Sequence, residues 1–268
     1  MEVLGLLLAA LIGVSLGLIG GGGSILTVPL LVYVIGVNPI LATSYSLFIV
    51  GATSLVGAVN NYRKGLVEVN TALLFGISSI STVWLTRKFL IPAIPFRIFH
   101  IGSWVMTEDI LTMVLFAVLM LGASMAMIRN GRQDAQSKAP SFKKVNLPKL
   151  LLYGIAIGLA TGLLGAGGGF LLIPTLVLLV RLPMKEAVGT SLFIIALNSL
   201  IGFTGDLGHF AMDWTFLLKI TLIAIAGIFV GGYFSKKVDG AKLKRWFGWF
   251  VLFMGIYILI KEIFFSSP

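Results

Sequence analysis

Apolar residues are gathered in long runs that recur along the whole chain. Ten such segments can be marked, at roughly 3–19, 24–36, 40–58, 67–86, 106–128, 150–164, 169–181, 186–204, 214–234 and 244–263. A helix of about 20 apolar residues is long enough to cross the hydrocarbon layer of a membrane. The pattern therefore predicts an all-α polytopic membrane protein.

The second and seventh segments are short, and each follows a glycine-rich stretch. The thirteen residues of 24–36 would rise about 20 Å as a helix, which is less than the roughly 30 Å of the bilayer core. These two segments are expected to be half-helices. The chain is then expected to have eight to ten spans.

The composition excludes a soluble protein of this size. Of the 268 residues, 58% are hydrophobic and 11% are charged, whereas a soluble domain carries about 25% charged residues. The 32 glycines suit close packing of membrane helices. There is no cysteine, so disulfides are excluded. The first run follows Glu2 without a preceding Lys or Arg, so it is expected to be a retained span and not a signal peptide.

The two halves of the chain match without a gap at a spacing of 145 residues. The identities in the first segments are Gly13, Gly17, Leu18, Gly20, Gly22, Gly23, Leu26 and Pro29 with Gly158, Gly162, Leu163, Gly165, Gly167, Gly168, Leu171 and Pro174. Further on, Ala42 and Ser46–Ile49 match Ala187 and Ser191–Ile194. The chain is therefore divided into a first transmembrane repeat (1–128), a basic cytoplasmic linker (129–149) and a second transmembrane repeat (150–268).

The distribution of basic residues predicts the orientation. If the linker is cytoplasmic, counting segments outward from it places fifteen of the twenty Lys and Arg on the cytoplasmic side, and Arg87, Lys88, Arg97 and Lys261 on the other. Five segments per repeat make the second repeat upside down relative to the first, which is the inverted-repeat plan of many secondary transporters. Both termini are expected outside, in a multi-pass protein of the cell membrane.

The strongest candidate site is the pair of glycine turns, Gly20–Ser24 and Gly165–Gly169. Glycine lets a ligand approach backbone N–H groups, and a helix that starts there has unpaired N–H donors suited to an anion. Two such half-helices in an inverted repeat can point at one central site. The expected backbone donors are Gly22, Gly23 and Ser24 with Gly167, Gly168 and Gly169. The alternative is that these glycines only permit tight helix packing.

Small hydroxyl residues form a second candidate set. Ser46, Thr190 and Ser191 are expected to donate to a substrate oxyanion, although such hydroxyls also bond within or between helices. Asn60, Asn61 and Asn198 are weaker polar candidates. Lys219 is expected to extend its ammonium toward the surface, and Glu68 and Asp213 to cap helices. No carboxylate is predicted near the centre of a span, so a buried acidic proton relay is not supported.

Several functions lack their signatures. His100 and His209 have no metalloprotease spacing, the glycines are not followed by the Lys-Ser/Thr of a nucleotide loop, and no segment offers a basic soluble surface for nucleic acid. We therefore expect no catalytic residues, no cofactor, no metal and no nucleic-acid partner. The expected partners are the lipid bilayer and a small anionic substrate. Homodimer formation is compatible with the sequence and not required by it.

The chain resembles the TauE/SafE family of sulfite exporters and sulfonate permeases in three features. These are the glycine motifs ending in Pro29 and Pro174, the two Ser-Leu-Phe-Ile runs, and the pairing of Val67–Val69 with Met212–Trp214. The resemblance covers nearly the whole chain. It implies a transporter of sulfite, sulfonates or related small anions with about eight spans. Only the second repeat keeps the family's Asp-Trp pair, at Asp213 and Trp214.

The sequence thus predicts a secondary transporter that exports a small sulfur-containing oxyanion through a central site. Two alternatives stay open. One is a permease for another small organic anion, such as a carboxylate or a thiol-derived anion. The other is a membrane scaffold that transports nothing.

Overall fold

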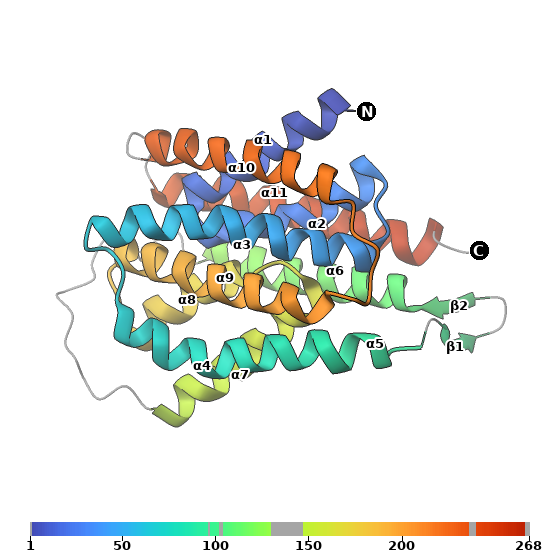
Figure 1. Ribbon diagram of the computed structural model, residues 1–268. Coiled ribbons are helices and arrows are strands. Elements are labelled where there is room, and N and C mark those ends of the chain that lie inside the picture. Colours follow the sequence, from blue (N-terminus) through green and yellow to red (C-terminus); the bar gives the residue numbers. More distant parts are fainter. Residues whose placement is uncertain (1, 96, 102–103, 130–146, 236–239, 266–268) are drawn as a thin grey trace.

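A computed structural model describes residues 2–95, 97–101, 104–129, 147–235 and 240–265 (Figure 1). The first half contains α1 (Glu2–Ile19), η1 (Gly20–Leu26), α2 (Thr27–Leu30), η2 (Leu31–Ile35), α3 (Pro39–Arg63), α4 (Val69–Leu85), η3 (Thr86–Leu90), α5 (Ile91–Ala93), β1 (Arg97–Ile101), β2 (Trp104–Thr107) and α6 (Glu108–Arg129). The second half contains α7 (Leu147–Leu164), α8 (Gly169–Thr175), η5 (Leu176–Val180), α9 (Met184–Asp206), α10 (Trp214–Ser235), α11 (Gly240–Ile260) and η6 (Lys261–Phe265). Here η1 is a 3₁₀-helix, and η2, η3, η5 and η6 are single π-helical turns.

The prediction of an all-α membrane protein is confirmed, and each of the ten apolar segments is helical. Within the described residues, six helical stretches are long and apolar enough to cross a membrane. They are Gly5–Ile35, Pro39–Arg63, Val69–Ala93, Glu108–Arg129, Met184–Asp206 and Trp214–Ser235. Large apolar side chains such as Leu7, Ile77, Leu222 and Phe253 are exposed on the outside of the bundle, as expected for helices that face lipid.

A short antiparallel hairpin of β1 and β2 was not predicted from the sequence. His100 pairs with Val105, and Ile101 pairs with Trp104. The hairpin projects beyond the helices at the end of the bundle that also carries both termini (Figure 1). The two strands are rich in β-branched and aromatic residues, which favour extended backbone.

The repeat is visible in how the helices pack. Helix α1 packs along α10, and α7, the repeat equivalent of α1, packs along α4, the repeat equivalent of α10. The two remaining equivalents α3 and α9 pack on each other at the centre. In Figure 1 each helix of these pairs runs opposite to its equivalent, so the second repeat is inverted.

The repeat extends to backbone conformation. The π-helical turns η2 and η5 lie 145 residues apart, and each ends at a residue with left-handed backbone, Gly36 (φ 83°) and Arg181 (φ 62°). Similarly, Gly20 and Gly165 have φ values of 67° and 66°. Shared apolar composition alone would not give equivalent residues the same backbone conformation.

The repeat relation ends after the fourth segment of each half. Residues 145 positions beyond the β1–β2 hairpin lie in helix α11, so the two halves differ there. Helices α6 and α11 pack on each other. Most of the predicted linker, 130–146, lies outside the described residues.

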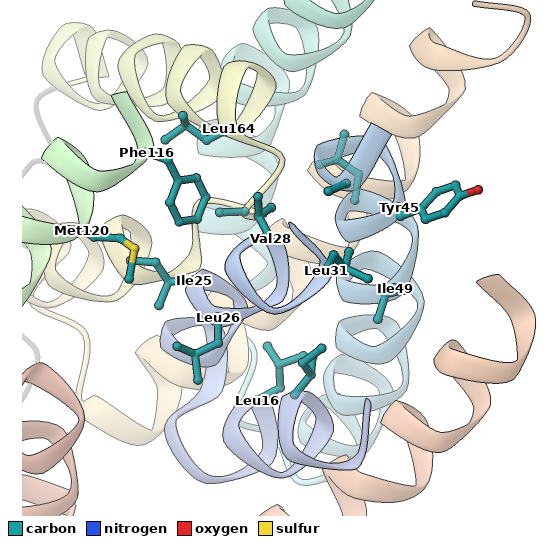
Figure 2. Close-up of a cluster of buried hydrophobic side chains, with 14 of the residues drawn as sticks. Leu16, Ile25, Leu26, Val28, Leu31, Tyr45, Ile49, Phe116, Met120 and Leu164 are labelled. Atoms are coloured by element: carbon teal, nitrogen blue, oxygen red, sulfur yellow. The ribbon is translucent and has the colours of Figure 1, made fainter. Parts of the chain in front are cut away.

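The second apolar segment lies inside the protein and not against lipid. Ile25, Leu26 and Val28 are buried in one cluster with Phe116 and Met120 of α6, as Figure 2 shows. Irregular backbone at membrane depth is tolerated only where protein or a polar cavity surrounds it. This burial accounts for the mixed 3₁₀, α and π geometry between Gly20 and Ile35.

Candidate functional site

The two glycine turns contact each other inside the protein, where Gly21 and Gly169 are both buried. A Cβ atom on Gly169 would overlap the carbonyl oxygen of Gly21, and one on Gly21 would lie 2.8 Å from Cα of Gly169. The backbones therefore touch with no side chain between them. The structure thus brings together the two turns that the sequence singled out, and their contact needs glycine on both sides.

The two turns differ in conformation although they occupy equivalent positions. The first is a 3₁₀-helix, in which a Cβ on Gly23 would overlap the backbone of Ser15 in α1. The second has left-handed backbone at Gly167 and Gly168. Gly168 caps α8, since its carbonyl oxygen accepts from the N–H groups of Leu171 and Leu172, both at 3.0 Å.

The four hydroxyl candidates have different surroundings. Ser24 donates to the carbonyl oxygen of Gly21 at 2.8 Å, and Ser191 donates to that of Val188 at 2.9 Å. Oγ1 of Thr190 accepts from the backbone N–H of Glu68 at 2.9 Å. Ser46 is fully buried, and its Oγ has no hydrogen-bond partner among the described residues. Ser46 is therefore the hydroxyl most available to a ligand.

A further polar set lies where α3 and α9 pack together. It consists of two pairs of repeat equivalents, Thr53 with Asn198 and Ser54 with Ser199, and all four are fully buried. The side-chain oxygens of Thr53, Ser54 and Ser199 and Oδ1 of Asn198 have no hydrogen-bond partner within the described part of the chain. A Cβ on Gly167 would lie 3.2 Å from Oγ of Ser199, so this set borders the second glycine turn. Pairing polar residues at the 145-residue spacing would have found it from sequence.

A buried ion pair between η3 and the end of α9 was not predicted from the sequence. Nη1 of Arg87 lies 3.2 Å from Oδ2 of Asp206, and both side chains are essentially inaccessible to solvent. The same Nη1 donates to Oγ1 of Thr43 at 3.0 Å, and Oγ of Ser44 donates to Oδ2 of Asp206 at 2.5 Å. Two residues of α3 thus hold the charged pair in place.

One sequence prediction is corrected by this pair. Arg87 was assigned to an outer loop, but it lies within the helical stretch Val69–Ala93 and is buried. Asp206 ends α9, so the prediction that no carboxylate lies near the centre of a span is not contradicted, but the residue is 0% exposed. Both charges lie just beyond the apolar segments marked from sequence, where hydropathy alone cannot distinguish a loop from a buried helix end.

Three other charged candidates are at the surface or near it. Lys219 is exposed, and the direction in which its ammonium extends stays a prediction. Asp213 caps α10 by accepting from the N–H of Phe216 at 3.0 Å. Glu68 stands at the equivalent position before α4 but makes no side-chain capping bond, so the expectation is wrong for Glu68.

Comparisons with known proteins agree with this architecture. The family profile described as sulfite exporter TauE/SafE matches residues 5–258. A probable membrane transporter protein of Xylella fastidiosa (strain 9a5c) is 31% identical over 256 residues, covering 94% of this chain and 92% of that protein. The probable membrane transporter protein YdhB of Bacillus subtilis (strain 168) is 25% identical over 243 residues, covering 89% and 92%. No solved structure matches this chain significantly. The chain belongs to the sulfite exporter TauE/SafE family of membrane transporters.

Proposed function

We propose that this transporter exports a small sulfur-containing oxyanion, sulfite or an organosulfonate, through the centre of the protein between the two glycine turns. The observation that carries the proposal is the direct contact of the turns through Gly21 and Gly169. Each turn comes from one of two inverted repeats. In transporters with this plan, substrate sites lie at the interface of the repeats near the middle of the membrane.

The proposed ligands are backbone N–H groups of the two turns, at Gly22, Gly23 and Ser24 and at Gly167, Gly168 and Gly169. Those of the first turn lie in the 3₁₀-helix η1, so they exchange its backbone bonds for the anion when the turns separate. Ser46 adds a buried hydroxyl that is free of other partners within the described structure. Thr190 contributes from α9, the equivalent of the helix that bears Ser46, because accepting from the N–H of Glu68 leaves its own O–H to donate. Ser191 contributes by turning its O–H away from the carbonyl oxygen of Val188. Neutral donors of this kind suit an oxyanion, because they can stabilise negative charge without a fixed counter-ion.

The contact between the turns also defines what transport requires. A backbone-to-backbone contact leaves no room for a sulfonate group between Gly21 and Gly169. Passage therefore requires the two turns to separate. This fits a mechanism in which helix groups move relative to each other around a central site.

The direction follows from the membrane potential. An interior-negative potential of 100 mV favours outward movement of an anion by about 2.3 kcal/mol per elementary charge. At 1.4 kcal/mol per factor of ten, that corresponds to a gradient of roughly fortyfold for a monovalent anion. Export therefore needs no coupling ion, whereas concentrative import would need one.

The test uses proteoliposomes loaded with labelled sulfite or methanesulfonate, with the voltage set by a potassium gradient and valinomycin. We expect an interior-negative potential to accelerate efflux and its collapse to slow efflux. Efflux that follows a proton or sodium gradient and ignores voltage would contradict uncoupled export. Transport of acetate or a thiol-derived anion, without transport of sulfite or methanesulfonate, would show that the substrate is another small organic anion. A purified, folded protein that moves none of these anions would support the scaffold alternative.

A further inference from the structure

The Arg87 guanidinium uses only one of its three nitrogens in the contacts described above. Nη1 donates both to Thr43 and to Asp206. Nε and Nη2 are buried and have no hydrogen-bond partner among the described residues. The N–H groups of the Nε–Nη2 edge point in parallel and match two oxygens of one oxyanion.

The ion pair is arranged end-on and is not bidentate. Only Oδ2 of Asp206 contacts the guanidinium, and Oδ1 has no partner within the described structure. Structural pairs commonly use both carboxylate oxygens and two N–H groups. Here Asp206 and Thr43 fix one end of the guanidinium and leave its two-donor edge unused.

The repeat provides an internal comparison. The residues equivalent to Arg87, Asp206, Thr43 and Ser44 are Gly232, Asn61, Val188 and Gly189. None of these four equivalents carries a charge, and Asn61 only donates to the carbonyl oxygen of Gly57 at 2.8 Å. The other end of the protein therefore packs the same helices without an ion pair. An ion pair is therefore not a general requirement for packing these helices.

The pair also lies next to the second glycine turn. A Cβ on Gly165, the first residue of that turn, would overlap the carbonyl oxygen of Thr43. The start of α3, the end of α9 and the η3 region all lie at the end of the bundle that carries both termini (Figure 1). Charged groups buried in membrane proteins mark substrate or ion pathways.

We propose that the Nε–Nη2 edge of Arg87 binds two oxygens of the transported oxyanion, at the end of the protein that carries both termini. The inference rests on the proposed function for the class of anion, a sulfite- or sulfonate-type group. Asp206 acts as a positioning residue that holds Nη1 and neutralises the guanidinium when no anion is bound. A bound anion takes over that role in part, so the carboxylate and the anion compete for the same charge.

The experiment measures anion binding to the purified full-length protein by thermal shift and isothermal titration, with methanesulfonate, sulfite, acetate and chloride at equal ionic strength. The variants are Arg87→Lys, Asp206→Asn and the double variant Arg87→Gln/Asp206→Asn. The control is Lys88→Gln, which removes an adjacent, exposed cation that lies over the ring of Trp84.

Asp206→Asn should bind methanesulfonate or sulfite at least tenfold more tightly than the wild type, because the anion no longer competes with the carboxylate. Its melting temperature should be low without the anion and recover when the anion is added. The double variant and Arg87→Lys should bind at least tenfold more weakly, since lysine keeps the charge but lacks the two-donor edge. Lys88→Gln should match the wild type. Should the double variant fail to fold, Arg87→Lys and Asp206→Asn decide the question.

Affinity of Arg87→Lys within twofold of the wild type would overturn the site, and so would an Asp206→Asn protein that no anion stabilises. Neither result would contradict the proposed export of the anion between the two glycine turns. Conversely, Arg87-dependent binding of acetate without any binding of methanesulfonate or sulfite would retain the anion site and refute the proposed substrate class. The anion site at Arg87 and the proposed substrate class can therefore be refuted independently of each other.

Discussion

The backbone N–H of Glu68 donates a hydrogen bond to Oγ1 of Thr190, 122 residues away in the second repeat. The same bond exists at the opposite end of the protein, where the N–H of Asp213 donates to the hydroxyl of Tyr45 at 2.8 Å. Glu68 and Asp213 are repeat equivalents, as are Tyr45 and Thr190. A central helix of each repeat therefore supports the start of a helix from the other.

Replacing Thr190 by Val should destabilise the protein by about 1 kcal/mol, because the partly buried N–H of Glu68 loses its acceptor. Tyr45→Phe should have a similar effect at the equivalent bond. Thr190→Ser keeps the hydroxyl and serves as the control. Thermal unfolding in detergent measures all three. Equal melting temperatures for Thr190→Val and Thr190→Ser would show that the bond contributes nothing.

Gly169→Ala should destabilise the protein by about 1–3 kcal/mol or more, since the new methyl group overlaps the backbone of the first glycine turn. Gly122→Ala, in helix α6, is the matched control because its methyl group would meet nothing within 4 Å. The control should be neutral or slightly stabilising, as alanine favours helix over glycine. Melting temperatures that fall equally in both variants would argue against a tight contact between the turns.

Arg181→Gly should stabilise the protein by about 1 kcal/mol. Arg181 is exposed and has the left-handed φ of 62°, which is unfavourable for a residue with a Cβ. The repeat equivalent of Arg181 is Gly36, and glycine adopts this left-handed conformation without a steric penalty. Lys185→Gly, at an exposed position in the first turn of α9, should destabilise the protein instead. Chemical or thermal unfolding compares the two, and an equal loss in both would contradict strain at Arg181.

Orientation in the membrane can be tested with single cysteines, because the chain has none of its own. Lys64 and His209 are repeat equivalents and both are exposed. An impermeant thiol reagent added to intact cells should label His209→Cys and leave Lys64→Cys unlabelled until the membrane is opened. Labelling of Lys64→Cys alone would place both termini in the cytoplasm.

Much of the fold could be predicted because the membrane imposes simple rules. Ten apolar segments, the glycine turns and the 145-residue spacing all correspond to elements of the structure. The spacing alone predicts that α7 repeats α1, and the helix packing shows the same relation. The β1–β2 hairpin could not be found in this way, since it lies in a stretch without a repeat equivalent.

The candidate site was only partly predictable. The meeting of the two glycine turns follows from inverted symmetry. The Arg87–Asp206 pair does not, because both residues lie just beyond the apolar segments marked from the sequence and neither has a charged repeat equivalent. Their burial depends on how η3 packs against the end of α9. This is a tertiary contact, which hydropathy and repeat spacing cannot predict.

The pairing of α1 with α10 has a mechanical consequence. Gly13 and Gly17 of α1 face Gly227 and Gly231 of α10, so the two backbones lie in direct contact with no side chains to rearrange between them. We expect two helices joined in this way to shift together, although one belongs to each sequence repeat. The parts that move as units are then not the two sequence halves. A cut of the chain between the repeats would leave α1 and α10 on different fragments that still have to pack together.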